Sequence, residues 1–169
     1  DPVKYYIQEK GLKVGDKVEI SFEANVNLAD YKSMTGGGTM LVTAGQLAKN
    51  THNIAGANPR TVIACDETRT KLYLITVDGR QDEAKGYTLA QLAEYLIEIG
   101  MYDAMNLDGG GSTTLVINDK GSQKVVNTPS EGSLRAVASG IGVVLKTLIT
   151  NMVQNPITSM MNANYIGIL

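Results

Sequence analysis

The chain has 169 residues and a mass of 18.1 kDa, which suits one domain or part of a larger one. Hydrophobic residues make up 43%, enough to fill a core, and this argues against a disordered chain. The 15 basic and 17 acidic residues leave a net charge of -2 without a basic run, which disfavours nucleic-acid binding. No apolar stretch reaches the roughly 18 residues of a membrane helix. A lone Cys65 excludes an internal disulfide, and no Cys/His set suits zinc.

The N-terminal part carries one predicted strand. The chain starts at Asp1-Pro2-Val3, without an initiator Met or a signal-peptide pattern. Residues 11–16 are typical of a turn. Residues 17–23 then alternate polar and apolar side chains, which predicts a half-buried strand.

A buried strand and a hairpin are predicted next. Residues 40–42 form a short apolar run, which predicts a buried strand, and Ala44-Gly45 predicts a turn after it. The polar residues 49–60 indicate a surface loop. The β-rich runs 61–65 and 71–77 are separated by five polar residues, which predicts a hairpin.

The clearest helix runs from Thr88 to Ile99. Its apolar residues fall on one face, as expected for a helix that covers a sheet. Thr88 and Gln91 have the spacing of a capping box, and Gly100 is a stop signal.

Four more strands are predicted after the helix, at residues 103–107, 113–117, 123–127 and 135–145. Together these elements predict an α+β fold, a mostly antiparallel sheet with one long helix packed across it. The apolar, Met-rich stretch that ends the chain lacks a clean period, so we expect residues 147–169 to be a tail or linker and residues 1–146 to be the domain.

The strongest chemical signal is the run Asn106-Leu107-Asp108-Gly109-Gly110-Gly111-Ser112 between two predicted strands. Consecutive glycines let a ligand approach the main chain, and their N–H groups can form an anion-binding nest beside the Ser112 and Thr113 hydroxyls. No Lys follows, so this is not a nucleotide-binding P-loop. A tight turn in which Asp108 caps its own backbone is an equally good interpretation.

Other candidates are weak when each is considered alone. Asp78-Gly79-Arg80 presents a carboxylate and then a guanidinium at a strand end, but it is also a common turn sequence. Arg60-Thr61 stands at the mouth of a strand. The single histidine, His52, lies in no nucleophile motif, so a Ser/His/Asp triad is disfavoured.

Taken in order, these segments resemble the phosphodiester glycosidase family, in the style of its bacterial branch. The resemblance covers roughly residues 12–144 and depends on six segments: Arg60-Thr61, Val77-Asp78-Gly79-Arg80, Thr88-Leu89, the Asn106–Ser112 run, Pro129-Ser130 and Arg135. One departure is Glu131, where the family often has Asp. Another is length, because family domains have further strands ahead of the part matched here.

The resemblance implies hydrolysis of an N-acetylglucosamine-type sugar-1-phosphodiester. Asp108, with Asp78 as second choice, is then the catalytic carboxylate. The implied substrate-binding residues are Arg60, Thr61, Arg80, Asn106, Gly109, Gly110, Gly111, Ser112, Thr113, Ser130 and Arg135. We expect no cofactor and no metal, although a cation shared by Asp78 and Asp108 stays open.

Two other functions remain open: a phosphodiesterase or transferase acting on cell-envelope polysaccharide, and a non-catalytic carbohydrate-binding module. The expected partners are a glycan or sugar-phosphate and either the upstream part of the same domain or a second chain. We expect no nucleic acid and no membrane span. The resemblance implies a secreted or cell-envelope setting, and we expect the chain to be the C-terminal part of a larger catalytic domain.

Overall fold

A computed structural model describes residues 7–19, 21, 24–49, 51–52, 54–143 and 166–168. The chain forms two compact units, Asp1–Thr35 and Gly36–Leu169. In the first unit, the 3-10 helix η1 (Leu28–Asp30) is capped by Asn27, whose side-chain oxygen accepts a hydrogen bond from the Ala29 N–H. The turn predicted at residues 11–16 is present, because the Asp16 N–H donates to the Lys13 carbonyl.

The strand predicted at residues 17–23 is absent from the described part of that range, residues 17–19 and 21. Val18 is 60% exposed. An alternating pattern forms a strand only where its apolar side can be buried and its backbone paired. Here the one described apolar residue of the range, Val18, faces solvent, so the prediction was wrong for these residues.

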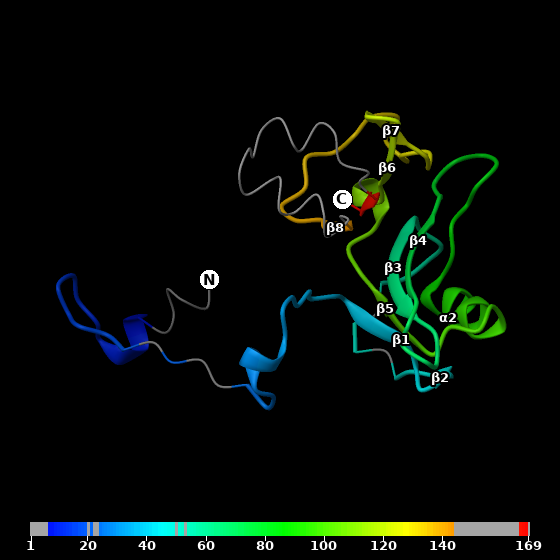
Figure 1. The fold of residues 1–169 in the computed structure, drawn as a ribbon. Helices are drawn as coiled ribbons and strands as arrows, with labels where there is room; N and C mark the ends of the chain where they lie inside the picture. Colours follow the sequence, from blue (N-terminus) through cyan, green and yellow to red (C-terminus); the bar gives the residue numbers. More distant parts are fainter. Residues whose placement is uncertain are drawn as a thin grey trace. The chain divides into compact units, whose positions relative to one another are not determined.

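The second unit is built on a five-stranded antiparallel sheet (Figure 1). Its order is β2-β1-β5-β3-β4, and its strands are β1 (Thr39–Thr43), β2 (Gln46–Leu47), β3 (Arg60–Cys65), β4 (Leu72–Val77) and β5 (Asp103–Asn106). The predicted hairpin is confirmed by the pairing of β3 with β4, from Arg60↔Val77 to Cys65↔Leu72. Central strand β5 pairs with both β1 and β3.

The helix α2 (Leu89–Glu98) confirms the sequence pattern. The Thr88 side chain accepts from the Gln91 N–H, and the Gln91 side chain accepts from the Thr88 N–H, which completes the capping box. Gly100 follows with φ +83°, the left-handed conformation that favours glycine at a helix end.

The core lies between α2 and one face of this sheet. Figure 1 shows α2 running across that face. Its buried members come from α2, from β1, β3 and β5, and from the connection between α2 and β5: Leu41, Val42, Val62, Ala64, Leu89, Leu92, Ala93, Leu96, Met101 and Ala104. A single helix lying across an antiparallel sheet confirms the α+β fold class.

A four-stranded antiparallel sheet follows in the order β7-β6-β9-β8. Its strands are β6 (Leu115–Asp119), β7 (Ser122–Val125), β8 (Ile141–Val143) and β9 (Ile166–Ile168). The strand predicted from Thr113 begins at Leu115, because the chain first makes a 3-10 turn. The long strand predicted at 135–145 is reduced to β8 within its described residues, 135–143, since residues 135–140 run as a mostly exposed loop or bend.

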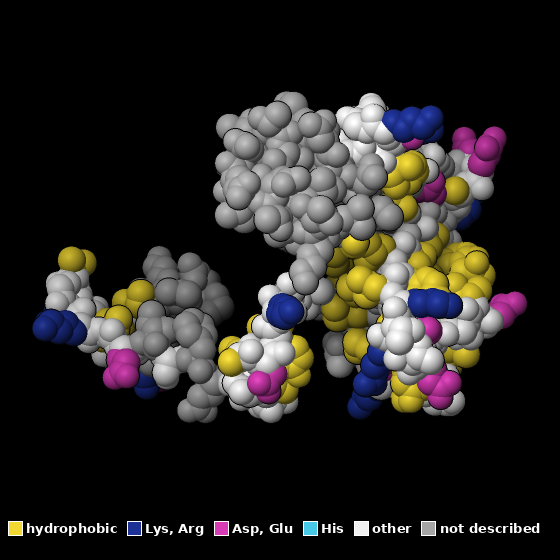
Figure 2. All heavy atoms as spheres, viewed as in Figure 1, with side chains coloured by type: hydrophobic (Ala, Val, Ile, Leu, Met, Phe, Trp, Pro, Cys, Tyr) yellow, Lys and Arg dark blue, Asp and Glu magenta, His cyan; other side chains and the backbone are white. Residues whose placement is uncertain are grey.

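The predicted tail, residues 147–169, lies mostly outside the described residues, and its end supplies β9. The division of the chain near residue 146 stays a prediction. Of the helices described, none is long and apolar enough to cross a membrane. On the face drawn in Figure 2, basic and acidic side chains are interspersed.

Candidate functional site

The glycine run lies where β5 leaves the sheet. Asp108 and Gly109 follow β5, and Gly110–Ser112 form the 3-10 turn η2 before β6. Gly110 has φ +61°. This conformation favours glycine, so the predicted special backbone of the run is present at this residue.

Close backbone contacts fix the start of the run against β3. The Gly110 N–H donates to the Pro59 carbonyl oxygen at 3.0 Å. A Cβ added at Gly109 would stand 2.7 Å from that same oxygen, closer than real Cβ atoms come. Glycine is therefore required at 109 by packing, and the Gly110 N–H is used within the protein rather than left free for an anion.

Arg80 lies over Gly110. A Cβ added at Gly110 would stand 3.1 Å from both terminal guanidinium nitrogens of Arg80. The guanidinium donates to Asn58 Oδ1 from Nε at 3.1 Å and from Nη2 at 2.9 Å. Since Asn58 is neutral, these bonds orient the arginine without offsetting its charge.

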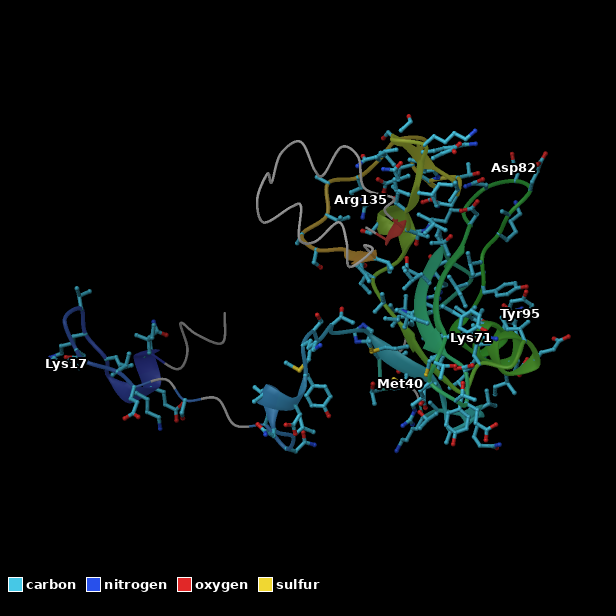
Figure 3. All side chains as sticks on the ribbon, in the orientation of Figure 1. Lys17, Met40, Lys71, Asp82, Tyr95 and Arg135 are labelled. Carbon is cyan, nitrogen blue, oxygen red and sulfur yellow. The ribbon has the colours of Figure 1, made fainter. Side chains whose placement is uncertain are left out.

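Arg135 lies over the next glycine, together with Glu131. A Cβ added at Gly111 would overlap the Glu131 carboxylate and stand 2.6 Å from Arg135 Nη2. Arg135 Nε donates to Glu131 Oε2 at 3.2 Å, and its Nη2 donates to Oε1. Figure 3 labels Arg135 on the segment between β7 and β8. Two arginines from distant segments therefore meet the same glycine turn.

Asp108 is exposed at the end of β5. Its Oδ1 accepts a hydrogen bond from the Gly109 N–H at 2.9 Å. This is the local cap that the turn interpretation predicted, and it holds the carboxylate at the head of the glycine run.

Asp78, the second predicted carboxylate, is engaged on both oxygens. Asn127 Nδ2 donates to Oδ1 at 3.1 Å, and the Thr128 N–H donates to Oδ2 at 2.9 Å. Asn127 also donates to the Thr113 carbonyl at 3.0 Å and accepts from the Leu115 N–H at 2.8 Å. Asp78 thus ties the end of β4 to the loop that leads to Arg135.

Arg60 is buried, with 2% of its surface exposed. Its Nε donates to the Tyr87 carbonyl at 3.0 Å, and its Nη2 donates to the carbonyls of Ile54 and Gly56 at 3.3 and 3.0 Å. Burial, and then the positive charge of Arg80, lower the pKa of Arg60. The guanidinium braces the loop before β3.

Four further predicted residues are buried: Thr61 in β3, Asn106 in β5, Ser112 in the turn and Thr113 directly after it. Thr61 Oγ1 donates to Thr113 Oγ1 at 3.3 Å, joining β3 to the exit of the turn. Asn106 Nδ2 donates to the Leu107 carbonyl at 2.8 Å. The buried Asn106 Oδ1 and Ser130 Oγ have no hydrogen-bond partner among the described residues.

The exposed His52 lies on the loop before β3, as predicted. Within the described part of the chain, no group of three or more His, Cys, Asp or Glu side chains gathers around one point.

Sequence reasoning missed three residues of this arrangement: Asn58, Asn127 and Glu131. The dipeptide Asn58-Pro59 is typical of a turn, and an asparagine in a turn can use its side chain to accept a hydrogen bond. The sequence therefore contained a signal for Asn58. Asn127 stands where β7 gives way to the loop, but its partners are distant in sequence. Glu131 was noted only as a departure from a family pattern.

The chain matches a protein family model over most of its length and individual proteins over shorter stretches. A family model described as phosphodiester glycosidase matches residues 7–144. The N-acetylglucosamine-1-phosphodiester alpha-N-acetylglucosaminidases of Bos taurus and Homo sapiens are each 44% identical over 59 residues, which are 35% of this chain and 11% of each relative. The chain thus spans about a tenth of the length of these curated relatives.

Two solved structures are also similar. One is the zebrafish N-acetylglucosamine-1-phosphodiester alpha-N-acetylglucosaminidase catalytic domain, auto-inhibited by its pro-peptide. It is 26% identical with a TM-score of 0.42, over 56% of this chain and 34% of that chain. The other is a hypothetical protein from Synechocystis, 26% identical with a TM-score of 0.40, over 47% of this chain and 16% of that one. Because the family model covers more than half of its residues, the chain belongs to the phosphodiester glycosidase family.

Proposed function

We propose that this chain contributes the phosphate-binding side of a glycoside hydrolase that cleaves an N-acetylglucosamine-type sugar-1-phosphodiester to free sugar and phosphomonoester. The observation that carries the proposal is the meeting of Arg80 and Arg135 at Gly110 and Gly111. Two guanidinium groups that lie against glycine backbone suit a phosphate, whose oxygens accept paired N–H donors. The names of the bovine and human relatives give the sugar and the bond.

Because the leaving group is a phosphate, what catalysis mainly requires is positive charge to stabilise it. A phosphomonoester has a second pKa of about 6, so it departs from a sugar carbon more easily than an alkoxide. Arg80 and Arg135 stabilise the negative charge that grows on the departing phosphate. Arg60 supports this site indirectly, because its hydrogen bonds to the Ile54 and Gly56 carbonyls hold the loop that carries Asn58.

We assign the catalytic carboxylate to Asp108. It is exposed, and its bond from the Gly109 N–H leaves Oδ2 to face the sugar carbon as it gains positive charge. Asp78 has both oxygens engaged by the loop after β7, so its part in the proposal is to hold that loop. The resemblance to the bacterial branch supports a secreted or cell-envelope setting.

The test is hydrolysis of an N-acetylglucosamine 1-phosphodiester in ¹⁸O-water by the full chain and by Asp108→Asn. We expect the label in the free sugar, and a loss of about a hundredfold or more in kcat for the variant with its fold intact. Asp119→Asn, an exposed aspartate at the end of β6, is the matched control. Label in the phosphate would indicate a phosphodiesterase. Binding without turnover, unchanged in Asp108→Asn, would indicate a carbohydrate-binding module.

A further inference from the structure

The anion site contains an acidic side chain that neither the proposed mechanism nor the predicted residue set uses. Glu131 extends from the loop after β7 and reaches the same glycine as Arg135. Its carboxylate accepts from two nitrogens of Arg135, and the two side chains remain 41% and 45% exposed. A phosphate that binds Arg135 at Gly111 therefore comes within a few ångströms of a carboxylate.

The charged groups at and beside the glycine turn come from four segments. Arg135 faces Glu131 directly, and Arg80 lies one glycine away, over Gly110. Arg60 is buried and interacts electrostatically with Arg80. Asp108 precedes the turn and bonds to the Gly109 N–H. Glu131 thus partly offsets the positive charge of Arg135, whereas the Arg80 side chain donates to the neutral amide of Asn58.

The proposed substrate and product differ by one charge at this point. A phosphodiester carries a single negative charge. A phosphomonoester carries close to two above its second pKa of about 6, and one below it. Like charges a few ångströms apart at a half-exposed site cost about 1 kcal/mol, which corresponds to about fivefold in affinity.

We propose that Glu131 shifts the selectivity of this site away from doubly charged phosphomonoesters and towards singly charged phosphodiesters. The inference rests on the proposed function, because it takes the glycine turn as the phosphate site. The arginines attract either ligand, and the Glu131 carboxylate repels the second charge of the monoester. The product then leaves more readily than it would from a site made of arginines alone, and Glu131 is a specificity-determining residue rather than a catalytic one.

The experiment compares the binding of dimethyl phosphate and methyl phosphate, which differ by one methyl group and one charge. Titrations of the full chain are followed through the Gly110 and Gly111 amide resonances at pH 8.0 and pH 5.0. At pH 8.0 we expect Glu131→Gln to raise the affinity for methyl phosphate relative to dimethyl phosphate by about fivefold over the parent. At pH 5.0, where methyl phosphate carries one charge, this change in the ratio should shrink.

Two controls separate charge from structure. Glu94→Gln removes the same charge from the exposed side of α2, and it should leave the ratio of the two affinities unchanged. Glu131→Asp keeps the charge on a shorter arm, and it should keep the ratio of the two affinities close to that of the parent. A ratio that is equal in the parent and in Glu131→Gln would overturn this inference alone. A parent chain that binds neither probe would overturn the phosphate site, and the proposed function with it.

Discussion

The buried and exposed sides of the glycine turn differ in what their polar groups bind. On the buried side, Arg60 donates to backbone carbonyls, and the Thr61 and Thr113 hydroxyls bond to each other. On the exposed side, Asp108 and Arg80 each bond to one near neighbour and still face solvent. The residues of these motifs therefore divide by burial into a framework and an exposed group, and this exposed group is the one that we propose to be ligand-facing.

The same difference in burial explains why two arginines at the ends of paired strands have different hydrogen-bond partners. Arg60 begins β3 and points to the covered face of the sheet, where burial demands that its donors be satisfied within the protein. Arg80 follows the end of β4 in a left-handed conformation, with φ +58°, which turns its side chain over Gly110. The variants below test whether the two groups separate in stability and in binding.

The largest expected effect is on the stability of Arg60→Met. The change removes three hydrogen bonds that the buried Arg60 side chain makes to the carbonyls of Ile54, Gly56 and Tyr87, so we expect a loss of about 3 kcal/mol in the free energy of unfolding. Arg80→Met, an exposed residue, should cost less than about 0.5 kcal/mol. Urea unfolding of both variants and of the parent measures the two losses of stability. Equal losses would contradict the division into framework and ligand-facing groups.

The second largest effect is expected for the stability of Asn127→Ala. It removes three hydrogen bonds that join Asp78, Thr113 and Leu115 through one side chain, and we expect a loss of about 2 kcal/mol. The loop that carries Arg135 should loosen as well, with faster amide exchange at Thr128. Asn25→Ala is the matched control, since Asn25 is exposed and belongs to the first unit. Unchanged exchange at Thr128 would show that Asn127 does not hold this loop.

Gly110→Ala tests the ligand-facing side with a smaller change. Its φ of +61° costs any other residue about 1 kcal/mol, and the new Cβ would stand 3.1 Å from the Arg80 guanidinium. Gly121→Ala has the same kind of strain, with φ +92°, but meets nothing within 4 Å. We expect similar losses of stability in both and weaker binding of inorganic phosphate in Gly110→Ala alone. Equal phosphate affinity in the two variants would mean that Arg80 does not serve the anion.

Sequence reasoning succeeded where one local signal decides the structure. The β3–β4 hairpin and α2 were predictable because alternation, capping at Thr88 and the stop at Gly100 all lie within a few residues. It failed at residues 17–19 and 21, whose alternation finds no surface to cover. Within the site, the glycine turn was predictable from its composition. The orientation of Arg60 was not, because it depends on carbonyls brought in by tertiary packing.

The smallest expected effect lies at the other end of β3, at the hairpin turn. Burial alone would raise the pKa of Asp66. Hydrogen bonds from the Thr68 hydroxyl and the Lys71 and Thr70 N–H groups, with the Lys71 charge, outweigh burial, so the pKa is lowered. A carboxylate whose pKa is lower in the folded state stabilises the fold above its unfolded value of about 3.9. That contribution disappears as the pH falls through the folded pKa.

Asp66→Asn removes this titration but keeps an oxygen that can accept from the Thr70 and Lys71 N–H groups. The parent should therefore be the more stable protein at pH 6, and the difference between the two should shrink as the pH falls below about 4. Urea unfolding of both proteins from pH 6 to pH 2.5 measures the difference. Because Asp66 and the glycine turn lie at opposite ends of β3, phosphate affinity at pH 8 should be equal in the two. A stability difference that stays constant with pH would show that the charge of the Asp66 carboxylate does not stabilise the hairpin turn. A changed phosphate affinity would mean that the hairpin turn and the proposed phosphate site are coupled along β3.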